Sequence, residues 1–145
     1  MPRILAVDWG GRRIGMALSD PQGIVATGLE TLEVRGAADA VARVLRAIRE
    51  HEAEAVVVGL PLLMSGERGE AAQRAQAFAD ALAARTEVPV DMYDERLTSA
   101  LSARRLRELG VRTGHAKRRV DQGAAIALLE SYLLRIRSRP AAPED

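Results

Sequence analysis

The stretch ILAVDWGGRRIGMALSD, residues 4–20, decides the fold at the start of the chain. Its aliphatic first half is typical of a core strand, and its paired glycines are typical of a tight hairpin turn that leads into a second strand. Asp8 ends the apolar run of the first strand, just before Gly10 and Gly11. A carboxylate at the end of a core strand is costly unless something positive meets it, so Asp8 needs a physical explanation.

The rest of the chain predicts alternating helices and strands. Residues 21–33 offer a third strand, which would complete an antiparallel meander. The continuous apolar run of residues 53–61 is typical of a strand buried on both faces in a parallel sheet. The other predicted elements are a helix over 36–52, a polar loop over 62–70, a helix over 70–85, a strand over 88–98, a helix from 98 or 99 to 109, and a final helix over 120–137. This order predicts an α/β fold: a mixed five-stranded sheet, three antiparallel strands followed by alternating α and β, with helices on both faces.

Two segments near the end of the chain lack any such pattern. Residues 112–119 have no apolar period, and we predict a mobile loop there. Residues 139–145 are rich in proline and charge, and we predict a disordered tail. A chain of 145 residues with 48% hydrophobic residues fits one domain, which we place at residues 1–138.

Composition narrows the chemistry. The chain has no cysteine, which excludes disulfides and thiolate metal sites, and its two histidines argue against a histidine-rich metal site. Any metal would be a hard ion held by carboxylates and water. The sequence starts without the long apolar run of a signal peptide, and its apolar runs are shorter than a membrane span. We therefore expect a cytoplasmic protein with no membrane partner.

Acidic residues stand at the ends of three predicted elements. Asp8 ends the first strand, Asp94 and Glu95 lie at the end of the last strand, and Asp121 opens the final helix. The carboxyl ends of parallel strands open onto one crevice. The helix face of Asp121 is continued by apolar residues, namely Ala125, Leu128 and Tyr132, so that face should lie on the sheet. Converging acids repel one another unless a cation neutralises them, and Mg²⁺ or Mn²⁺ suits an all-oxygen site.

Each acid also has an ordinary structural explanation. Asp8 could cap the glycine turn. Asp94 or Glu95 could pair with Arg96. Asp121 could be a charge at a helix N-terminus that the helix dipole favours. The metal hypothesis depends on all three positions together.

Two metal ions that lie about 4 Å apart and share carboxylate ligands are a common arrangement in enzymes that cut phosphodiester bonds. Flanking phosphates would then be held by basic residues, for which the candidates are Arg12, Arg13, Arg96, Lys117, Arg118 and Arg119. Only 3% of the chain is aromatic, so the sequence does not favour recognition of splayed single bases by stacking. Recognition of backbone and shape fits the composition better.

Four segments carry a family resemblance: VDWGGRRIGMALSD, VVVGLPLLMSGERGE, YDERLTSALSARRL and VDQGAAIALLESYL. In this order, over residues 4–135, they closely resemble the YqgF (RuvX) family. The resemblance implies an RNase H-like fold, related to the Holliday junction resolvase RuvC, and a metal-dependent nuclease. It also implies nucleic acid as the partner: the 5′ end of pre-16S ribosomal RNA first, with branched DNA as the alternative.

Carried over to matching positions, the family's acids are Asp8, Glu95 and Asp121. Adjacent strand residues face opposite ways, so only one of Asp94 and Glu95 should enter the site, and the family pattern favours Glu95. The GLP segment supplies no acid, and we expect it to shape the site or contact phosphate. Trp9 stands where the family usually has Tyr or another aromatic residue.

Other functions compete with a ribosomal RNA nuclease. A Holliday junction resolvase must cut two strands symmetrically, which calls for a homodimer with paired sites. A glycine turn between strands also resembles the phosphate loop of actin-like ATPases, but those need two such domains around the nucleotide. A non-catalytic scaffold or regulator of nucleic-acid machinery would keep the fold without the cutting, and the intact acids argue against it.

Overall fold

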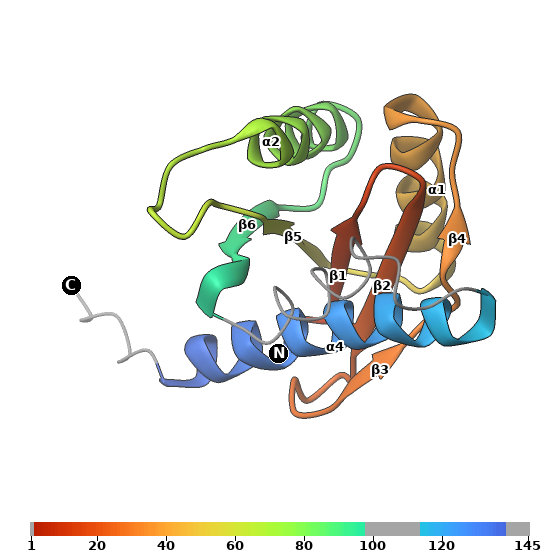
Figure 1. Cartoon of the computed structure of the whole chain (residues 1–145). Coiled ribbons are helices and arrows are strands. Elements are labelled where there is room, and N and C mark those ends of the chain that lie inside the picture. The colour runs from red at the N-terminus through yellow and green to blue at the C-terminus, as the bar shows by residue number, and fades with distance from the viewer. Residues whose placement is uncertain (1, 98–113, 139–145) are drawn as a thin grey trace.

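The computed structural model describes residues 2–97 and 114–138, with side chains described for residues 2–97 and 123–137. These residues build a six-stranded mixed sheet with helices on both faces (Figure 1). The strands are β1 (Ile4–Trp9), β2 (Arg13–Ser19), β3 (Ala26–Gly28), β4 (Leu32–Glu33), β5 (Ala55–Leu60) and β6 (Val90–Asp94). The helices are α1 (Ala37–Glu50), α2 (Glu70–Ala83), the short 3₁₀ turn η1 (Glu95–Leu97) and α4 (Gly114–Ser138).

The strand order brings distant parts of the chain to one edge of the sheet. The order is β3-β2-β1-β5-β6, and β4 also pairs with β2. β1 runs antiparallel to β2 and parallel to β5, and β5 runs parallel to β6. The carboxyl ends of β1, β5 and β6 therefore lie at the same edge, which is where ligands bind in sheets of this kind.

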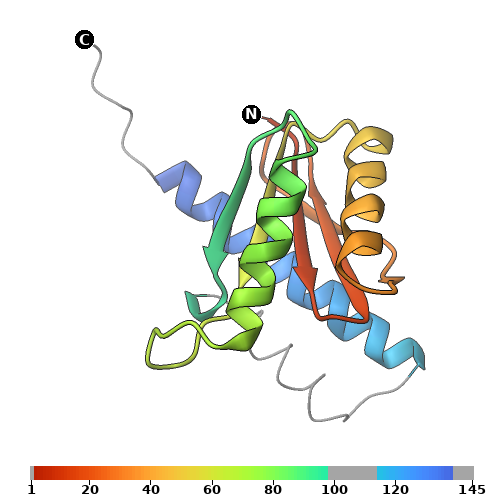
Figure 2. The ribbon, with the colours of Figure 1, turned by 90° about the horizontal axis from the view of Figure 1, so that it is seen from above.

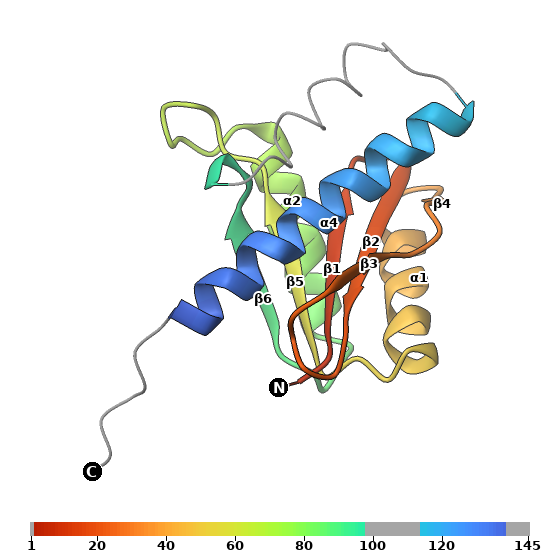
Figure 3. The same ribbon diagram turned by 90° about the horizontal axis from the view of Figure 1, so that it is seen from below.

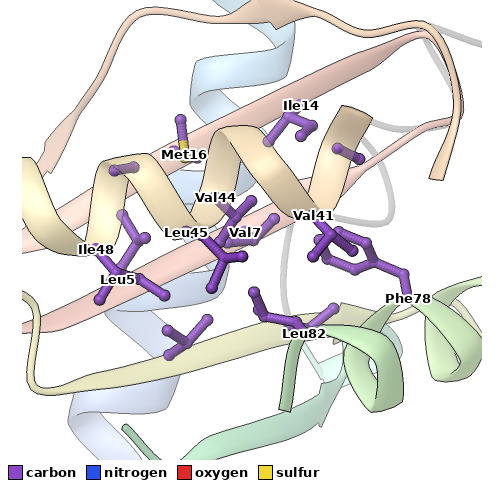
Figure 4. Packing of buried hydrophobic residues seen from close by; sticks show 14 of the residues in the cluster. Leu5, Val7, Ile14, Met16, Val41, Val44, Leu45, Ile48, Phe78 and Leu82 are labelled. Atoms are coloured by element: carbon purple, nitrogen blue, oxygen red, sulfur yellow. The ribbon is translucent and has the colours of Figure 1, made fainter. Parts of the chain in front are cut away.

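The sheet separates two hydrophobic cores. α1 and α2 lie side by side on one face, and α4 covers the other (Figure 2). The side chains of β1 alternate between the cores: Leu5 and Val7 pack under α1 and α2, and Ile4 and Ala6 pack under α4. Figure 4 shows Leu5 and Val7 among the side chains of α1 and α2. The same alternation puts Asp8 on the α4 face.

α4 crosses its face of the sheet obliquely, from the β1–β2 hairpin towards β6 (Figure 3). Two tyrosine hydroxyls fasten its C-terminal half to β6. The Tyr93 hydroxyl lies 3.0 Å from the Ser131 hydroxyl, and the Tyr132 hydroxyl donates to Asp91 Oδ2 at 2.8 Å. The other half of the helix therefore lies over the end of β1 that carries Asp8.

The predicted fold class is confirmed, but the sheet has one strand more than the five predicted. The third predicted strand, over residues 21–33, is divided into β3 and β4. Both pair with β2, but residues 29–31 stand opposite only Gly15 and Met16, so the register shifts by one residue. An extra residue of this kind is a β-bulge, which interrupts the ladder. The N–H of Leu29 donates to the carbonyl of Met16 at 2.9 Å and holds the bulge against β2.

The start of the last helix was also predicted wrongly. α4 begins at Gly114 instead of residue 120, so the predicted mobile loop over 112–119 is helical from residue 114 onwards. Alanine, lysine and arginine are strong helix formers, and they extend this helix beyond the apolar face that made it recognisable. The predicted helix over 98–109 and the predicted tail over 139–145 fall outside the described residues.

In the described part of the chain, no helix combines the length and the apolar character that crossing a membrane requires. The longest of the described helices, α4, carries Arg135 and Arg137 in its last turn.

Candidate functional site

Asp8 is a fully buried acid near the carboxyl end of β1. It follows the apolar residues of β1 on the face that α4 covers. Its partner in β2 is Gly15, and its neighbour in β5 is Gly59, because Val7 and Val58 are paired and Asp8 and Gly59 are the next residues of two parallel strands. Asp8 is therefore flanked by glycine on both sides, which leaves its carboxylate room on this face of the sheet.

Glu95 is the second fully buried acid, and it belongs to η1, directly after β6. Its carboxylate lies over Gly59: a Cβ atom at Gly59 would overlap Oε1 of Glu95 and would lie 3.0 Å from its Cδ. Gly59 comes two residues after Val57, which packs under α4, so this contact lies on the same face of the sheet as Asp8. Neighbouring strands are about 4.8 Å apart, so the Glu95 carboxylate over β5 lies within about one strand spacing of β1. Two acids far apart in the sequence are thus buried on the same face of the sheet, over the neighbouring strands β1 and β5.

The side chains of the adjacent acids Asp94 and Glu95 have different surroundings. Asp94 accepts a hydrogen bond from Arg96 Nη2 at 2.7 Å and further bonds from Arg96 Nε at 3.0 and 3.1 Å. The side-chain hydrogen bonds of Arg96 lower the pKa of Asp94 below its usual value of 3.8. The ordinary explanation, pairing with Arg96, therefore applies to Asp94, and the buried position belongs to Glu95.

Arg96 also ties η1 to the loop that follows β5. Its Nη1 donates to the carbonyl of Met64 at 3.4 Å, and its guanidinium lies against Gly66. Gly66 has a φ of 91°, a left-handed conformation that favours glycine. The loop that the GLP segment opens thus borders this edge of the sheet. The guanidinium of Arg96 is hydrogen-bonded to Asp94. The phosphate contact predicted for Arg96 stays a prediction.

The position of Asp121 is described only for the backbone. It lies in α4, and its side chain lies outside the described residues. Ala125 and Leu128, which were predicted to share its helix face, are fully buried in the core under α4. Among the residues with described side chains, no group of three His, Cys, Asp or Glu could hold a metal ion. The described part of the site supplies two buried carboxylates, whose oxygens are donors that Mg²⁺ and Mn²⁺ accept.

Besides Arg96, two of the basic residues predicted to contact phosphate, Arg12 and Arg13, have described side chains, and both lie at the edge of the sheet that carries Asp8. Arg12 is exposed in the hairpin turn, and Arg13 is half-buried with its Nη2 3.8 Å from Glu33 Oε1. Both arginines line a cavity of about 310 Å³ together with Glu33 and Val34. The remaining predicted contacts lie in the first turns of α4, and their side chains are outside the described residues; they are Lys117, Arg118 and Arg119.

Sequence reasoning missed the part that Gly59 plays. The signal was present, because Gly59 is the one residue without a side chain in the apolar run of β5, in the segment AVVVGL. Read locally, that glycine marks only the approach of a turn. Its relation to Glu95 becomes visible only when β6 is placed beside β5.

The fold is that of the RNase H-like resolvases. RuvC of Thermus thermophilus, solved in complex with a Holliday junction substrate, superposes with a TM-score of 0.58 at 20% identity, covering 95% of this chain and 98% of that one. The Holliday junction resolvase of fowlpox virus, solved with its DNA junction, gives a TM-score of 0.56 at 11% identity, covering 92% and 98%. At these identities the likeness establishes the fold.

Sequence similarity identifies the family within this class. Residues 2–135 match the RuvX family, which is described as Holliday junction resolvase, and the chain belongs to that family. A relative from Chloroflexus aurantiacus is 44% identical over 137 residues, covering 94% of this chain and 90% of the relative. One from Rhodococcus erythropolis is 44% identical over 148 residues, covering 99% and 83%. Both carry the name "Putative pre-16S rRNA nuclease". The description of the family and the name of these relatives both denote enzymes that cut phosphodiester bonds, which confirms the predicted nuclease class.

Proposed function

We propose that this protein is a divalent-metal-dependent nuclease whose metal site is formed by Asp8, Glu95 and Asp121. The observation that carries the proposal is the burial of Asp8 and Glu95 at the same edge of the sheet, with the Glu95 carboxylate over Gly59 of the strand between them. Two acids buried so close together repel each other, and a bound cation removes that repulsion. Mg²⁺ or Mn²⁺ fits the all-oxygen donors, and two ions fit phosphodiester cleavage.

The chain's own residues supply position and shielding. A bound divalent ion lowers the pKa of a coordinated water and stabilises the departing oxygen. Asp8 is held by β1 and Glu95 by the η1 turn, which the Asp94–Arg96 pair fastens. Arg12 and Arg13 lie at the end of the hairpin, where they would hold phosphates that flank the bond to be cut.

The substrate we propose is precursor ribosomal RNA, cut near the 5′ end of the 16S sequence, in the cytoplasm. The names of relatives at 44% identity support this substrate. The low aromatic content supports recognition of a structured RNA by its backbone and shape, because splayed bases are usually held by aromatic stacking.

A four-way DNA junction is the second candidate substrate. The description of the RuvX family favours it. Symmetric cutting of a junction requires two active sites related by a two-fold axis, so this candidate also requires a homodimer.

The decisive experiment compares the wild-type protein with Asp8→Asn on labelled precursor RNA and on a labelled four-way junction, side by side in Mn²⁺. We expect Asp8→Asn to abolish cleavage of the preferred substrate, because the neutral amide is a poor metal ligand. Folding should be unchanged or slightly more stable, because the change relieves repulsion between buried acids. Asp80→Asn is the matched control, since Asp80 is an exposed acid in the C-terminal half of α2 and should leave cleavage unchanged.

Calorimetric titration with Mn²⁺ separates a nuclease from a scaffold. A nuclease should bind Mn²⁺ in a way that Asp8→Asn removes, whereas a scaffold has no reason to do so. Equal cleavage by wild type and Asp8→Asn would exclude this site, and cleavage of the junction alone would replace the ribosomal RNA proposal by the second candidate.

A further inference from the structure

The backbone conformation at Gly59 does not explain why this residue is a glycine. In the part of the chain that the structure describes, the glycines with φ in the left-handed region are Gly11, Gly23, Gly36 and Gly66, and Gly59 is not among them. An L-residue could therefore adopt the backbone conformation of Gly59 without strain. Within β5 the neighbouring positions hold valine and leucine, which are the residues expected in a buried parallel strand.

The space that a side chain at Gly59 would need is already filled by Glu95. A Cβ atom there would overlap Oε1, and it would lie 3.0 Å from Cδ and 3.1 Å from Cγ of the same side chain. Three atoms of one residue thus meet the Cβ position. Real Cβ contacts are rarely so short, so the Glu95 side chain in this position and any side chain at residue 59 exclude each other.

Resting on the proposed metal site, we propose that Gly59 is a positioning residue for that site. Glu95 follows β6, and Asp8 lies on β1, with β5 between them. The carboxylate of Glu95 can approach Asp8 only by lying across β5 at the position where β5 has no side chain. The glycine thereby allows an acid from η1 to serve a site on a strand that is not its neighbour.

The effect of adding a methyl group at Gly59 follows from what can move. The backbone of η1 is held, because the N–H of Arg96 donates to Asp94 Oδ1 at 2.9 Å and the guanidinium of Arg96 binds Asp94 and the Met64 carbonyl. The atoms that meet the added methyl belong to a flexible side chain. In Gly59→Ala the Glu95 side chain should therefore turn away, while β5 and the sheet keep their places.

The first test measures Mn²⁺ affinity by calorimetry for the wild type, Gly59→Ala and Gly69→Ala. We expect Gly59→Ala to weaken Mn²⁺ binding by about tenfold or more, the usual effect of losing a residue that orients a metal ligand. Gly69→Ala is the matched control: a Cβ at Gly69 meets only the flexible side chain of Leu63, at 3.3 Å, so Mn²⁺ affinity should stay at the wild-type value.

The second test uses folding stability in the absence of metal. Urea unfolding in EDTA is measured for the wild type, Gly59→Ala, Glu95→Ala and the double variant. If Gly59 serves Glu95, the substitution at residue 59 lowers stability when the Glu95 side chain is present. The same substitution lowers it little in the Glu95→Ala background, because nothing then opposes the methyl group. If Gly59→Ala fails to fold while the double variant folds, the steric conflict with Glu95 is also demonstrated.

The outcomes separate this inference from the proposed function. Wild-type protein that binds no Mn²⁺, or binds it independently of Asp8, contradicts the proposed metal site. Asp8-dependent binding that is unchanged in Gly59→Ala leaves the metal site intact and overturns the role of Gly59. A stability loss at residue 59 that is equal with and without the Glu95 side chain also overturns it.

Discussion

At the scale of single residues, the segment Asp94–Glu95–Arg96 has its side chains on opposite sides of the chain: two form a surface ion pair, and the one between them is buried. Asp94 and Arg96 bind each other at 2.7 Å, and both stay partly exposed. Glu95, between them, is fully buried beside Gly59. The exposed pair holds the turn, so that the buried acid keeps its direction. An ion pair on the surface is worth little by itself, but here it fixes the backbone of a residue that the proposed site needs.

The Asp94–Arg96 pair should give stability a pH dependence with a definite sign. Arg96 holds the pKa of folded Asp94 below the unfolded value of 3.8. The contribution of the pair is therefore present above pH 3.8 and is lost as the pH falls through the lower pKa of the folded protein. Asp94→Asn should lower the free energy of unfolding by roughly 0.5–1 kcal/mol at neutral pH.

Urea unfolding of both proteins, from neutral pH down into the acid range, checks this prediction. The difference between wild type and Asp94→Asn should shrink below pH 3.8. The pKa of Asp20 is also lowered, by hydrogen bonds from the backbone of Ile24 and Val25, but both proteins contain Asp20 and its effect cancels. A difference that stays constant over this range would contradict the role given to the pair.

At the scale of elements, α4 is held by a narrow stripe of apolar residues. Fully buried positions recur along it at helical spacing, namely Ala124, Ala125, Leu128, Leu129 and Leu133. They pack on Ile4, Ala6 and Val57 of the central strands. This stripe sets which face of α4 meets the sheet, and so it sets how the N-terminal half of the helix, which contains Asp121, lies over β1.

Truncating this stripe should destabilise the protein strongly. Leu128→Ala should lower the free energy of unfolding by about 2–5 kcal/mol, because it leaves a cavity in a closed core. Leu134→Ala is the matched control on the same helix: Leu134 is 58% exposed, and its truncation should cost at most about 0.5 kcal/mol. Thermal and urea unfolding of the two variants make the comparison, and equal losses would show that α4 does not rest on the sheet as described.

At the scale of the whole molecule, the parallel arrangement of β1, β5 and β6 gathers the chemistry at one edge. Asp8 and Glu95 lie at that edge, and the hairpin between β1 and β2 brings Arg12 and Arg13 to it. The face carrying α1 and α2 holds other arginines, such as Arg43, which pairs with Asp39 of its own helix at 3.5 Å. A nucleic acid bound at the acids would therefore extend along the edge and over the start of α4.

Replacing Lys117, Arg118 and Arg119 together by Ala should weaken nucleic-acid binding and make it less dependent on salt. If all three contact phosphates, the slope of log affinity against log salt concentration should become shallower by about 2 to 3. The matched control replaces Arg43, Arg46 and Arg49 of α1, which changes the net charge equally on the other face. Binding curves at several salt concentrations test this prediction. Equal slopes for the wild type and the variant of residues 117–119 would show that the start of α4 does not contact the nucleic acid.

Much of the fold was predictable from local pattern. The aliphatic run of β1, the glycine hairpin, the helical spacing of apolar residues in α1 and the apolar run of β5 each predict an element whose type the structure confirms. The bulge at residues 29–31 was not predictable, because the register of a strand depends on its partner. The start of α4 at Gly114 was also missed, because a helix made of polar helix formers has no apolar period to recognise.

The candidate site was predictable only in part. The sequence pointed to Asp8 and Glu95, since acids at the ends of apolar strands are unusual, and both prove to be fully buried. The choice of Glu95 over Asp94 needed a family pattern in addition to strand alternation. The metal and the ligand role of Asp121 remain predictions that the Mn²⁺ titrations test.

The sequence by itself determined the type of the elements around the site and which of their residues turn inward, because these depend on side-chain spacing within a few residues. Only the tertiary structure decided that Glu95 lies over Gly59 and beside the strand of Asp8. That arrangement depends on the order and register of three strands from separate parts of the chain. Those are set by packing over the whole sheet, and no local segment records them.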